Sequence, residues 1–101
     1  MQLKNGLSLV SVVDTTNVIV IRVSRPDAVL TCGGAPMRIK GEEYELAAPD
    51  EAFQGGSILG KRYVDADGAI EVLCTKGGPS SLALDGIALT ILQAKPLPAS
   101  D

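Results

Sequence analysis

A short pattern that occurs twice constrains the fold of this chain more than any other feature of the sequence. Residues 11–37 and residues 62–89 share their apolar positions, with an offset of 51 residues in the first block and 52 in the second. One inserted residue near Pro79 reconciles the two offsets. A repeat of this kind indicates one structural unit that is built twice. The corresponding positions are Val13/Val64, Asp14/Asp65, Ile19/Ile70, Ile21/Val72, Leu30/Leu82, Gly34/Gly86 and Met37/Leu89.

Each copy reads as a strand, a tight turn, a second strand, a loop and a short strand. Residues 18–23 form a nearly continuous β-branched run, which is typical of a buried strand. Asp-Gly pairs at 67–68 and 85–86 stand between apolar residues and are typical of hairpin turns. We therefore predict an all-β fold, a small sandwich or barrel of two tandem units related by a pseudo-twofold axis. The side chains expected in the shared core are Ile19, Ile21, Val23, Ile70, Val72 and Cys74.

A length of 101 residues suits one compact domain. Within it we expect a first β unit over residues 1–40, a linker over 41–59, a second β unit over 60–94 and an extended tail over 95–101. Pro96 and Pro98 flank Leu97 in this tail. Proline has no N–H to donate to a sheet, so the tail is expected to lie outside the strands.

Composition excludes several classes of partner. The net charge is −3, which disfavours binding to the phosphates of nucleic acids or to anionic membranes. Only Phe53, Tyr44 and Tyr63 are aromatic, so base-stacking surfaces are poorly supplied. The sequence contains neither a membrane-length apolar run nor the pattern of a signal peptide. Two cysteines do not make a disulfide framework, so we expect reduced thiols and a cytoplasmic location.

Two short motifs in the repeat resemble a known family. The motif CGGAPM at 32–37 and the motif YVDADG at 63–68 are similar to desulforedoxin and to the N-terminal domain of desulfoferrodoxin, which are small rubredoxin-like β folds. In that family an aromatic residue precedes a Cys-x-x-Cys turn. A β-branched strand and a Gly-rich loop then lead to Leu-x-Cys-Cys-Gly-x-x-Met. Each copy of the repeat resembles one such unit.

The resemblance implies an iron or zinc site held by four thiolates in each unit. In the first copy the expected thiolate positions carry Asp14, Asn17, Cys32 and Gly33. In the second copy they carry Asp65, either Asp67 or Gly68, Leu84 and Asp85. One position in eight is still a cysteine. We therefore expect the scaffold to persist without its metal, and we predict no cofactor.

The two cysteines are expected to differ in role. Cys32 stands beside two glycines in a turn, where it is a candidate metal ligand or redox nucleophile. The alternative is a small residue that only fits the turn, and the chain has no His to activate a thiol. Cys74 is in phase with Ile70 and Val72 on a predicted strand, so we expect it to pack in the core.

Three aspartates of the second copy are candidate ligands. Asp65, Asp67 and Asp85 converge if the second copy keeps the geometry of the family, and carboxylates that lie together can bind a hard cation. The alternative is ordinary turn chemistry, in which Asp accepts hydrogen bonds from nearby backbone N–H groups. The same alternative applies to Asp14 with Asn17.

Catalysis lacks its usual components here, because the sequence has no His, no nucleophile–base pair at a recognisable spacing and no phosphate-binding loop. We predict that the chain is not an enzyme. It is expected to be a binding or accessory protein, a protein-interaction subunit that has lost the metal site of a rubredoxin-like ancestor. One alternative is a small iron- or zinc-binding electron-transfer protein that uses Cys32 with carboxylates. Another is a small subunit that completes a larger enzyme.

The predicted interface lies on the strand over residues 18–23. This strand is apolar on both faces, so one face is expected to contact a protein partner or a second copy of the chain. We expect Val18, Val20 and Leu97 of the tail to be the contact residues.

Overall fold

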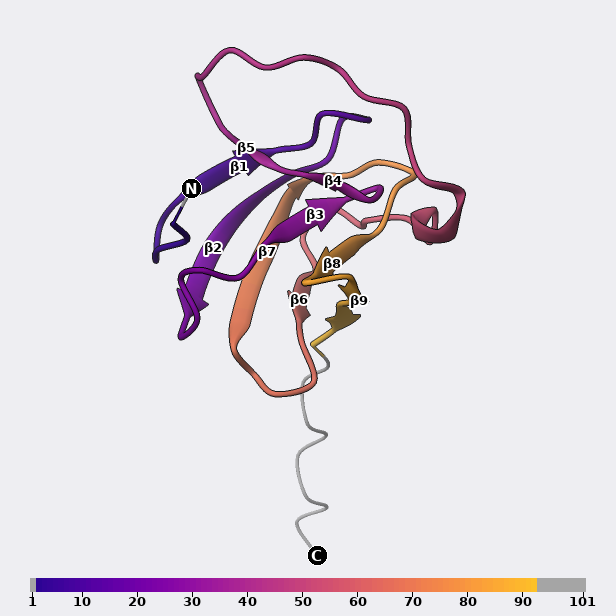
Figure 1. Ribbon diagram of the computed structural model, residues 1–101. Helices are drawn as coiled ribbons and strands as arrows, with labels where there is room; N and C mark the ends of the chain where they lie inside the picture. Colours follow the sequence, from indigo (N-terminus) through magenta and orange to yellow (C-terminus); the bar gives the residue numbers. More distant parts are fainter. Residues whose placement is uncertain (1, 93–101) are drawn as a thin grey trace, which may run out of the picture.

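The computed structural model describes residues 2–92 and is all-β, as predicted (Figure 1). A 3-10 helix, η1, spans Glu51–Phe53 in the segment between the two halves. The strands of the first half are β1 (Ser8–Val10), β2 (Asn17–Val23), β3 (Leu30–Cys32), β4 (Ala35–Pro36) and β5 (Arg38–Ile39). The strands of the second half are β6 (Arg62–Val64), β7 (Ile70–Lys76), β8 (Leu82–Leu84), β9 (Ile87–Ala88) and β10 (Thr90–Ile91).

The strands form two antiparallel sheets that pack around one core. The six-stranded sheet has the order β10-β6-β7-β2-β1-β5, and the four-stranded sheet has the order β4-β3-β8-β9. Exchanging each strand of the first half for its counterpart in the second half gives both orders again, read in reverse, so every strand keeps equivalent neighbours. The central pairs, β2 with β7 and β3 with β8, join the two halves. The strand pairing therefore has the pseudo-twofold pattern expected from an internal duplication.

Equivalent pairs of residues give the true offset of the repeat. Leu9 pairs with Val18 in the first half as Tyr63 pairs with Val72 in the second, which is an offset of 54 residues. Met37 N–H donates to Leu30 O as Leu89 N–H donates to Leu82 O, which is an offset of 52. The predicted correspondence is right for this second block. It is wrong for the first block, where Val13/Val64, Asp14/Asp65, Ile19/Ile70 and Ile21/Val72 are not equivalent.

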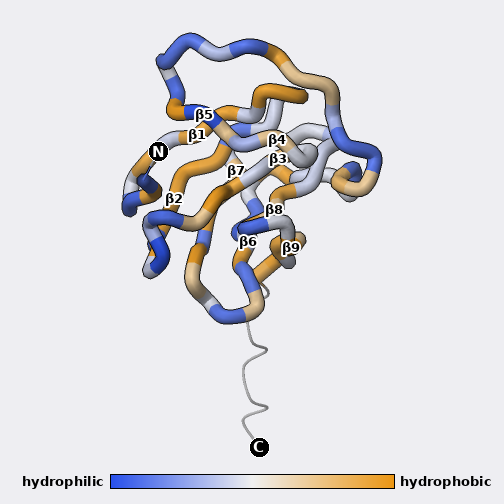
Figure 2. Tube along the Cα trace, in the orientation of Figure 1, coloured by the Kyte–Doolittle hydropathy of each residue, from blue (hydrophilic) through white to orange (hydrophobic). Residues whose placement is uncertain are grey.

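The core confirms four of the six predicted side-chain directions and corrects the other two, Ile19 and Ile21. Ile70, Val72 and Cys74 are buried as predicted, and Figure 2 shows β2 and β7 as apolar central strands. In β2, however, Val18 and Val20 face the core, while Ile21 is 36% exposed. A one-residue change of phase turns every side chain of a strand to the opposite face.

A register shift between Val20 and Arg22 explains the end of β2. Val20 pairs with Val72 and Arg22 pairs with Glu71, so Ile21 is an extra residue on this strand. Such a bulge leaves one residue unpaired and shifts the phase of the strand by one residue beyond it. Val23 consequently packs against the core, as predicted, whereas Ile21 points outward.

Burial also corrects the predicted contact residues. Val18 and Val20 are 1% and 0% exposed, so they belong to the core of the single chain and cannot line a surface. Leu97 lies outside the described residues. Within residues 2–92, no helix has the length and apolar character needed to cross a membrane.

Candidate functional site

The turn between β1 and β2 is organised by two hydroxyl groups and a carboxylate. Ser11 Oγ accepts hydrogen bonds from the backbone N–H groups of Val13 at 3.1 Å and Asp14 at 3.2 Å. The N–H of Ser11 donates to the carbonyl of Thr16 at 2.8 Å and closes the turn. Ser and Asp commonly hold such turns, because their short side chains reach backbone N–H groups nearby.

Asp14 is the centre of this turn. Its Oδ1 accepts from Thr16 N–H at 2.9 Å, and its Oδ2 accepts from Ser80 N–H at 2.9 Å and from Thr16 Oγ1 at 3.1 Å. Burial raises the pKa of Asp14, but hydrogen bonds from the two backbone N–H groups and from the Ser11 and Thr16 hydroxyls outweigh it. The net effect is a pKa below the usual value, so the carboxylate is ionised and saturated with protein donors.

Cys32, at the end of β3, reaches the same carboxylate. Its thiol donates to Asp14 Oδ1 at 3.8 Å, and the residue is 0% exposed. This burial favours the alternative in which Cys32 is a small residue that fits the turn, over the candidate role of metal ligand or redox nucleophile. Burial, with a further contribution from the charge of Asp14, raises the pKa of Cys32 to about 11. Since the thiolate is the nucleophile and the metal ligand, Cys32 is held in its unreactive form.

A loop from the second half completes the arrangement. Thr15 Oγ1 donates to Gly77 O at 2.7 Å, and a Cβ added at Gly78 would lie 2.5 Å from both Asp14 Oδ2 and Thr16 Oγ1. Only glycine therefore allows the 77–80 backbone to approach Asp14 this closely. We call this group the first polar cluster, and its members are Ser11, Asp14, Thr16, Cys32 and Ser80.

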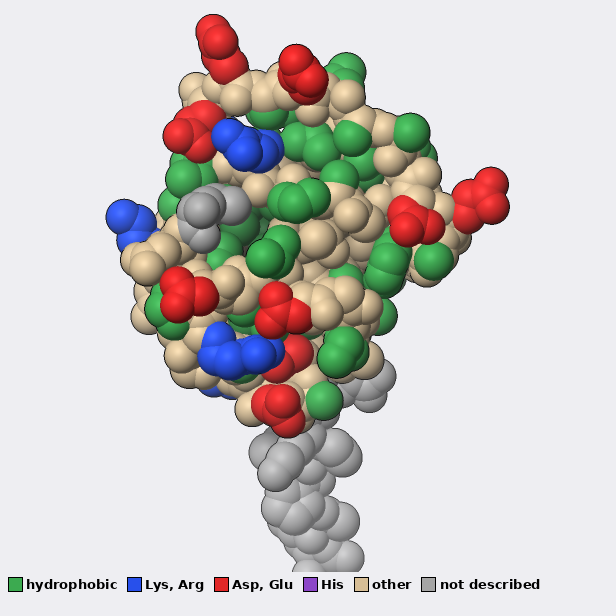
Figure 3. All heavy atoms as spheres, viewed as in Figure 1, with side chains coloured by type: hydrophobic (Ala, Val, Ile, Leu, Met, Phe, Trp, Pro, Cys, Tyr) green, Lys and Arg blue, Asp and Glu red, His purple; other side chains and the backbone are tan. Residues whose placement is uncertain are grey.

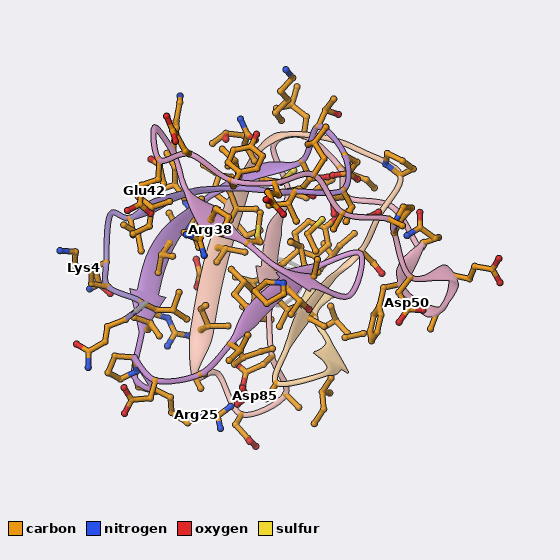
Figure 4. All side chains as sticks on the ribbon, turned by 45° about the horizontal axis from the view of Figure 1, so that its top comes forward. Lys4, Arg25, Arg38, Glu42, Asp50 and Asp85 are labelled. Carbon is orange, nitrogen blue, oxygen red and sulfur yellow. The ribbon has the colours of Figure 1, made fainter. Side chains whose placement is uncertain are left out.

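A second polar cluster lies at the pseudo-equivalent turn of the other half. Arg25 contacts Asp85 Oδ2 at 3.5 Å and Asp65 Oδ2 at 4.0 Å (Figure 4 shows Arg25 beside Asp85). Asp65 Oδ1 also accepts from Ile70 N–H at 3.0 Å, and Asp85 Oδ1 accepts from Val29 N–H at 2.9 Å. The structure thus brings Asp65 and Asp85 together through an arginine of the first half.

Asp67 does not join this second cluster. It is exposed in the hairpin turn, and Asp65 and Asp85 each already contact an arginine and a backbone N–H group. The hydrogen-bonding alternative therefore describes Asp65 and Asp85. Their donors, however, are Ile70 N–H, five residues onward, and Val29 N–H, just before β3, rather than groups two residues away. Across residues 2–92, no group of three or more His, Cys, Asp or Glu side chains is placed to hold a metal ion.

Both clusters are chemically satisfied. Every buried side-chain nitrogen and oxygen atom within the described part of the chain has a hydrogen-bond partner. Cys74 packs in the core as predicted, and its thiol donates to Lys76 O at 3.2 Å. The two clusters are therefore suited to joining turns of the two halves, because their buried polar groups already form hydrogen bonds within the chain.

The sequence prediction missed three members of the first polar cluster. It placed Asn17 there, but Asn17 lies in β2, where it pairs with Val10 and Lys76. Ser11, Thr16 and Ser80 were not predicted. One available signal was the Ser11-x-x-Asp14 spacing, which matches the Cys-x-x-Cys spacing of the resembled family and corresponds to Asp65-x-x-Gly68 at an offset of 54.

Comparison of the chain with family models, with curated proteins and with solved structures finds no match.

One surface feature lies apart from the clusters, on the outer face of the six-stranded sheet. Ile19 and Leu73 are paired across β2 and β7, and both point away from the core because their neighbours Val18, Val20 and Val72 point into it. Ile21 lies next to Ile19 on this face. We call these three residues, Ile19, Ile21 and Leu73, the outer apolar strip.

Charged residues border the outer apolar strip. Glu71 contacts Arg22 Nε at 3.5 Å and Arg62 Nη1 at 3.0 Å, and its own side chain is 9% exposed while the two arginines are more than half exposed. The strip is thus an apolar centre with an arginine-rich margin.

Proposed function

We propose that this protein is a non-catalytic interaction subunit that binds another polypeptide through the outer apolar strip. The observation that carries the proposal is the strip itself, in which Ile19, Ile21 and Leu73 are contiguous at the junction of the two halves. Isolated apolar residues on a surface need no explanation, whereas a contiguous group bordered by polar residues is typical of a protein interface. Arginine is also enriched at interfaces, which fits the margin of Arg22 and Arg62.

The predicted contact strand is retained in this proposal, but its contact face is changed. Ile19 and Ile21 replace Val18 and Val20, since the latter pair is buried. The partner is a protein chain, either a second copy or a different one. We propose no cofactor, no nucleic acid and no membrane as a partner. The cytoplasm remains the proposed compartment, because both cysteines are free thiols.

The proposal also includes descent from a rubredoxin-like scaffold that lost its metal site. Asp14 and Cys32, two of the positions where the resemblance implies thiolates, lie together with Ser11, and hydrogen bonds join the turns that a metal would otherwise join. A structural zinc ion contributes on the order of 10 kcal/mol to folding, so its loss requires a replacement. The pairing of two fused halves supplies many such contacts.

Site-specific photo-crosslinking tests the proposal. A photo-reactive residue is introduced at position 21 and, as a matched control, at Ala48, which is exposed in the segment between the halves. We expect position 21 to give one discrete adduct in the cells from which the chain comes, and Ile21→Lys to abolish association where Ala48→Lys does not. Sedimentation of the purified protein then shows whether the adduct is a second copy.

Equal adduct yields at positions 21 and 48, or none at position 21, would refute the proposal. The mass of a specific adduct also addresses the alternative of an enzyme subunit, because a larger catalytic chain would be identified directly.

A further inference from the structure

The outer face of the six-stranded sheet places apolar side chains between positively charged ones. One row of paired residues crosses this face from β5 to β6 and consists of Lys40, Ser8, Ile19, Leu73 and Arg62. The row begins and ends with a cation and has two members of the outer apolar strip in its middle. A partner for this face therefore needs an apolar side chain beside a carboxylate.

Positive charge is in excess at the margin of the strip. Arg22 and Arg62 share one carboxylate, that of Glu71. The side chains of Arg22 and Arg62 are 55% and 54% exposed, whereas that of Glu71 is 9% exposed. The unneutralised guanidinium donors thus face solvent, where a carboxylate of another molecule can pair with them.

An acidic segment projects from a different part of the same molecule. The chain leaves the sheet after Lys40 and returns to its own body at Ala47, whose N–H donates to Val12 O at 2.9 Å. Between these points it arches away from β1 and β5 (Figure 1), and acidic side chains stand out at the top of the molecule in Figure 3. Every residue from 41 to 46 is exposed. We call residues 41–46 the acidic strap.

The acidic strap carries the groups that the sheet face lacks. Its sequence, GEEYEL, contains three glutamates and no cation. Tyr44 lines a groove with Val12 and Pro36 of its own chain. Leu46, in contrast, is 81% exposed, so it makes little contact with its own chain and is available to another molecule. Glu45 places a carboxylate directly beside it.

We infer that the outer apolar strip binds the acidic strap of a second copy of this chain. Leu46 of one copy packs on Ile21 and Leu73 of the other. Glu45, next to Leu46 in the strap, pairs with Arg62, which lies opposite Leu73 on the neighbouring strand. Adjacent residues of an extended segment are about 3.3 Å apart and adjacent strands about 4.8 Å apart, so the two contacts form together.

This inference rests on the proposed function, because it names the occupant of the same strip. The apolar contact supplies affinity, and the opposite charges at its margin select this partner and speed its approach. The contact joins two unlike surfaces, so each copy offers one strap and one sheet face.

Mixing two defective variants of the full-length chain tests the inference. A strap variant carries Glu45→Lys and Leu46→Ser, and a face variant carries Ile21→Glu. We expect each variant alone to self-associate at least about tenfold more weakly than the natural chain in sedimentation. An equimolar mixture should form a 1:1 complex, because the intact strap of the face variant binds the intact face of the strap variant.

A matched control carries the same two kinds of substitution outside the strap. Glu51→Lys with Ala52→Ser changes exposed residues of η1 and gives the same net charge as the strap variant. This control should associate as the natural chain does, and the amide NMR spectrum of each variant reports whether it is folded. A mixture of strap and face variants that stays monomeric, under conditions where the natural chain associates, would overturn the inference.

Photo-crosslinking of the purified protein separates this inference from the proposed function. With the photo-reactive residue at position 21, we expect the adduct to join two copies and its peptide map to end within residues 42–46. An adduct that forms in cells with a different chain, and not in the purified protein, would overturn the inference and leave the proposed function standing. An adduct elsewhere within the same chain would also overturn it, and the absence of any adduct at position 21 would overturn both.

Discussion

Removal of the Asp14 carboxylate should cost this fold much of its stability. In Asp14→Ala the N–H groups of Thr16 and Ser80 and the hydroxyl of Thr16 lose their acceptor, at original distances of 2.9, 2.9 and 3.1 Å. Each hydrogen bond to a charged group contributes about 1.5–3 kcal/mol when buried, and Asp14 is only partly buried. With about 1 kcal/mol for each bond, we expect the free energy of unfolding to fall by about 3 kcal/mol.

Urea unfolding at neutral pH measures this change against two controls. Asp67→Ala removes an exposed aspartate and should change the free energy of unfolding by less than about 0.5 kcal/mol. Asp14→Asn keeps one acceptor oxygen for Thr16 but turns an N–H₂ group toward Ser80 N–H, so its loss should be intermediate. A loss below about 1 kcal/mol in Asp14→Ala, with an unchanged m value, would refute the role given to this carboxylate.

The pH dependence supplies a second measurement on the same variants. The pKa of Asp14 is lowered from 3.8 in the folded state, so its charge stabilises the fold above the unfolded-state pKa. That contribution is lost as the pH falls through the folded-state pKa. The difference in stability between the natural chain and Asp14→Ala should therefore shrink below about pH 4. If the difference in stability between the natural chain and Asp14→Ala stays constant down to acid pH, the lowered pKa of Asp14 is contradicted.

Three further outcomes are expected. Val72→Ala should cost about 2–4 kcal/mol in urea unfolding because it opens a cavity in the core, whereas Ile21→Ala on the outer face should cost less than about 1 kcal/mol. Gly78→Ala should destabilise by about 1–3 kcal/mol through overlap with the first polar cluster, while Gly55→Ala should be nearly neutral, since its Cβ would lie 3.6 Å from the nearest atom. The pKa of Cys32 is about 11 in the folded chain against 9.0 in the unfolded chain, so the protonated thiol contributes stability that is complete below pH 9 and is lost as the pH rises toward 11. The free energy of unfolding should therefore decline between pH 9 and pH 11, and it should decline less steeply in Cys32→Ala.

The second β unit was predictable from sequence because polar residues mark its phase. Asp-Gly turns lie next to its strands, and the polar residue Glu71 between Ile70 and Val72 marks the outward positions of β7, so the core residues there were predicted correctly. In β2 the run from Val18 to Ile21 is apolar throughout. Periodicity cannot then decide which face is inside, and the predicted phase was wrong by one residue. The burial of Val18 and Val20 in the structure shows which face of β2 is inside.

The first polar cluster was only partly predictable for a different reason. Asp14 and Cys32 stood out as unusual residues, whereas Ser11, Thr16 and Ser80 are common in any loop. Their importance comes from the approach of the 77–80 loop, which is distant in sequence from the turn it completes. Long-range contacts of this kind are not encoded in local spacing.

The central strand pairs have a consequence for how the chain reaches its folded state. Val20 pairs with Val72 and Thr31 with Ala83, so each half meets its neighbour only across a long stretch of chain. Contacts of high sequence separation slow folding, because the entropy of closing the loop is lost before the strands pair. A second chain offers each half the same partner, so refolding at high concentration should yield domain-swapped dimers in which two chains exchange halves about the segment between β5 and β6.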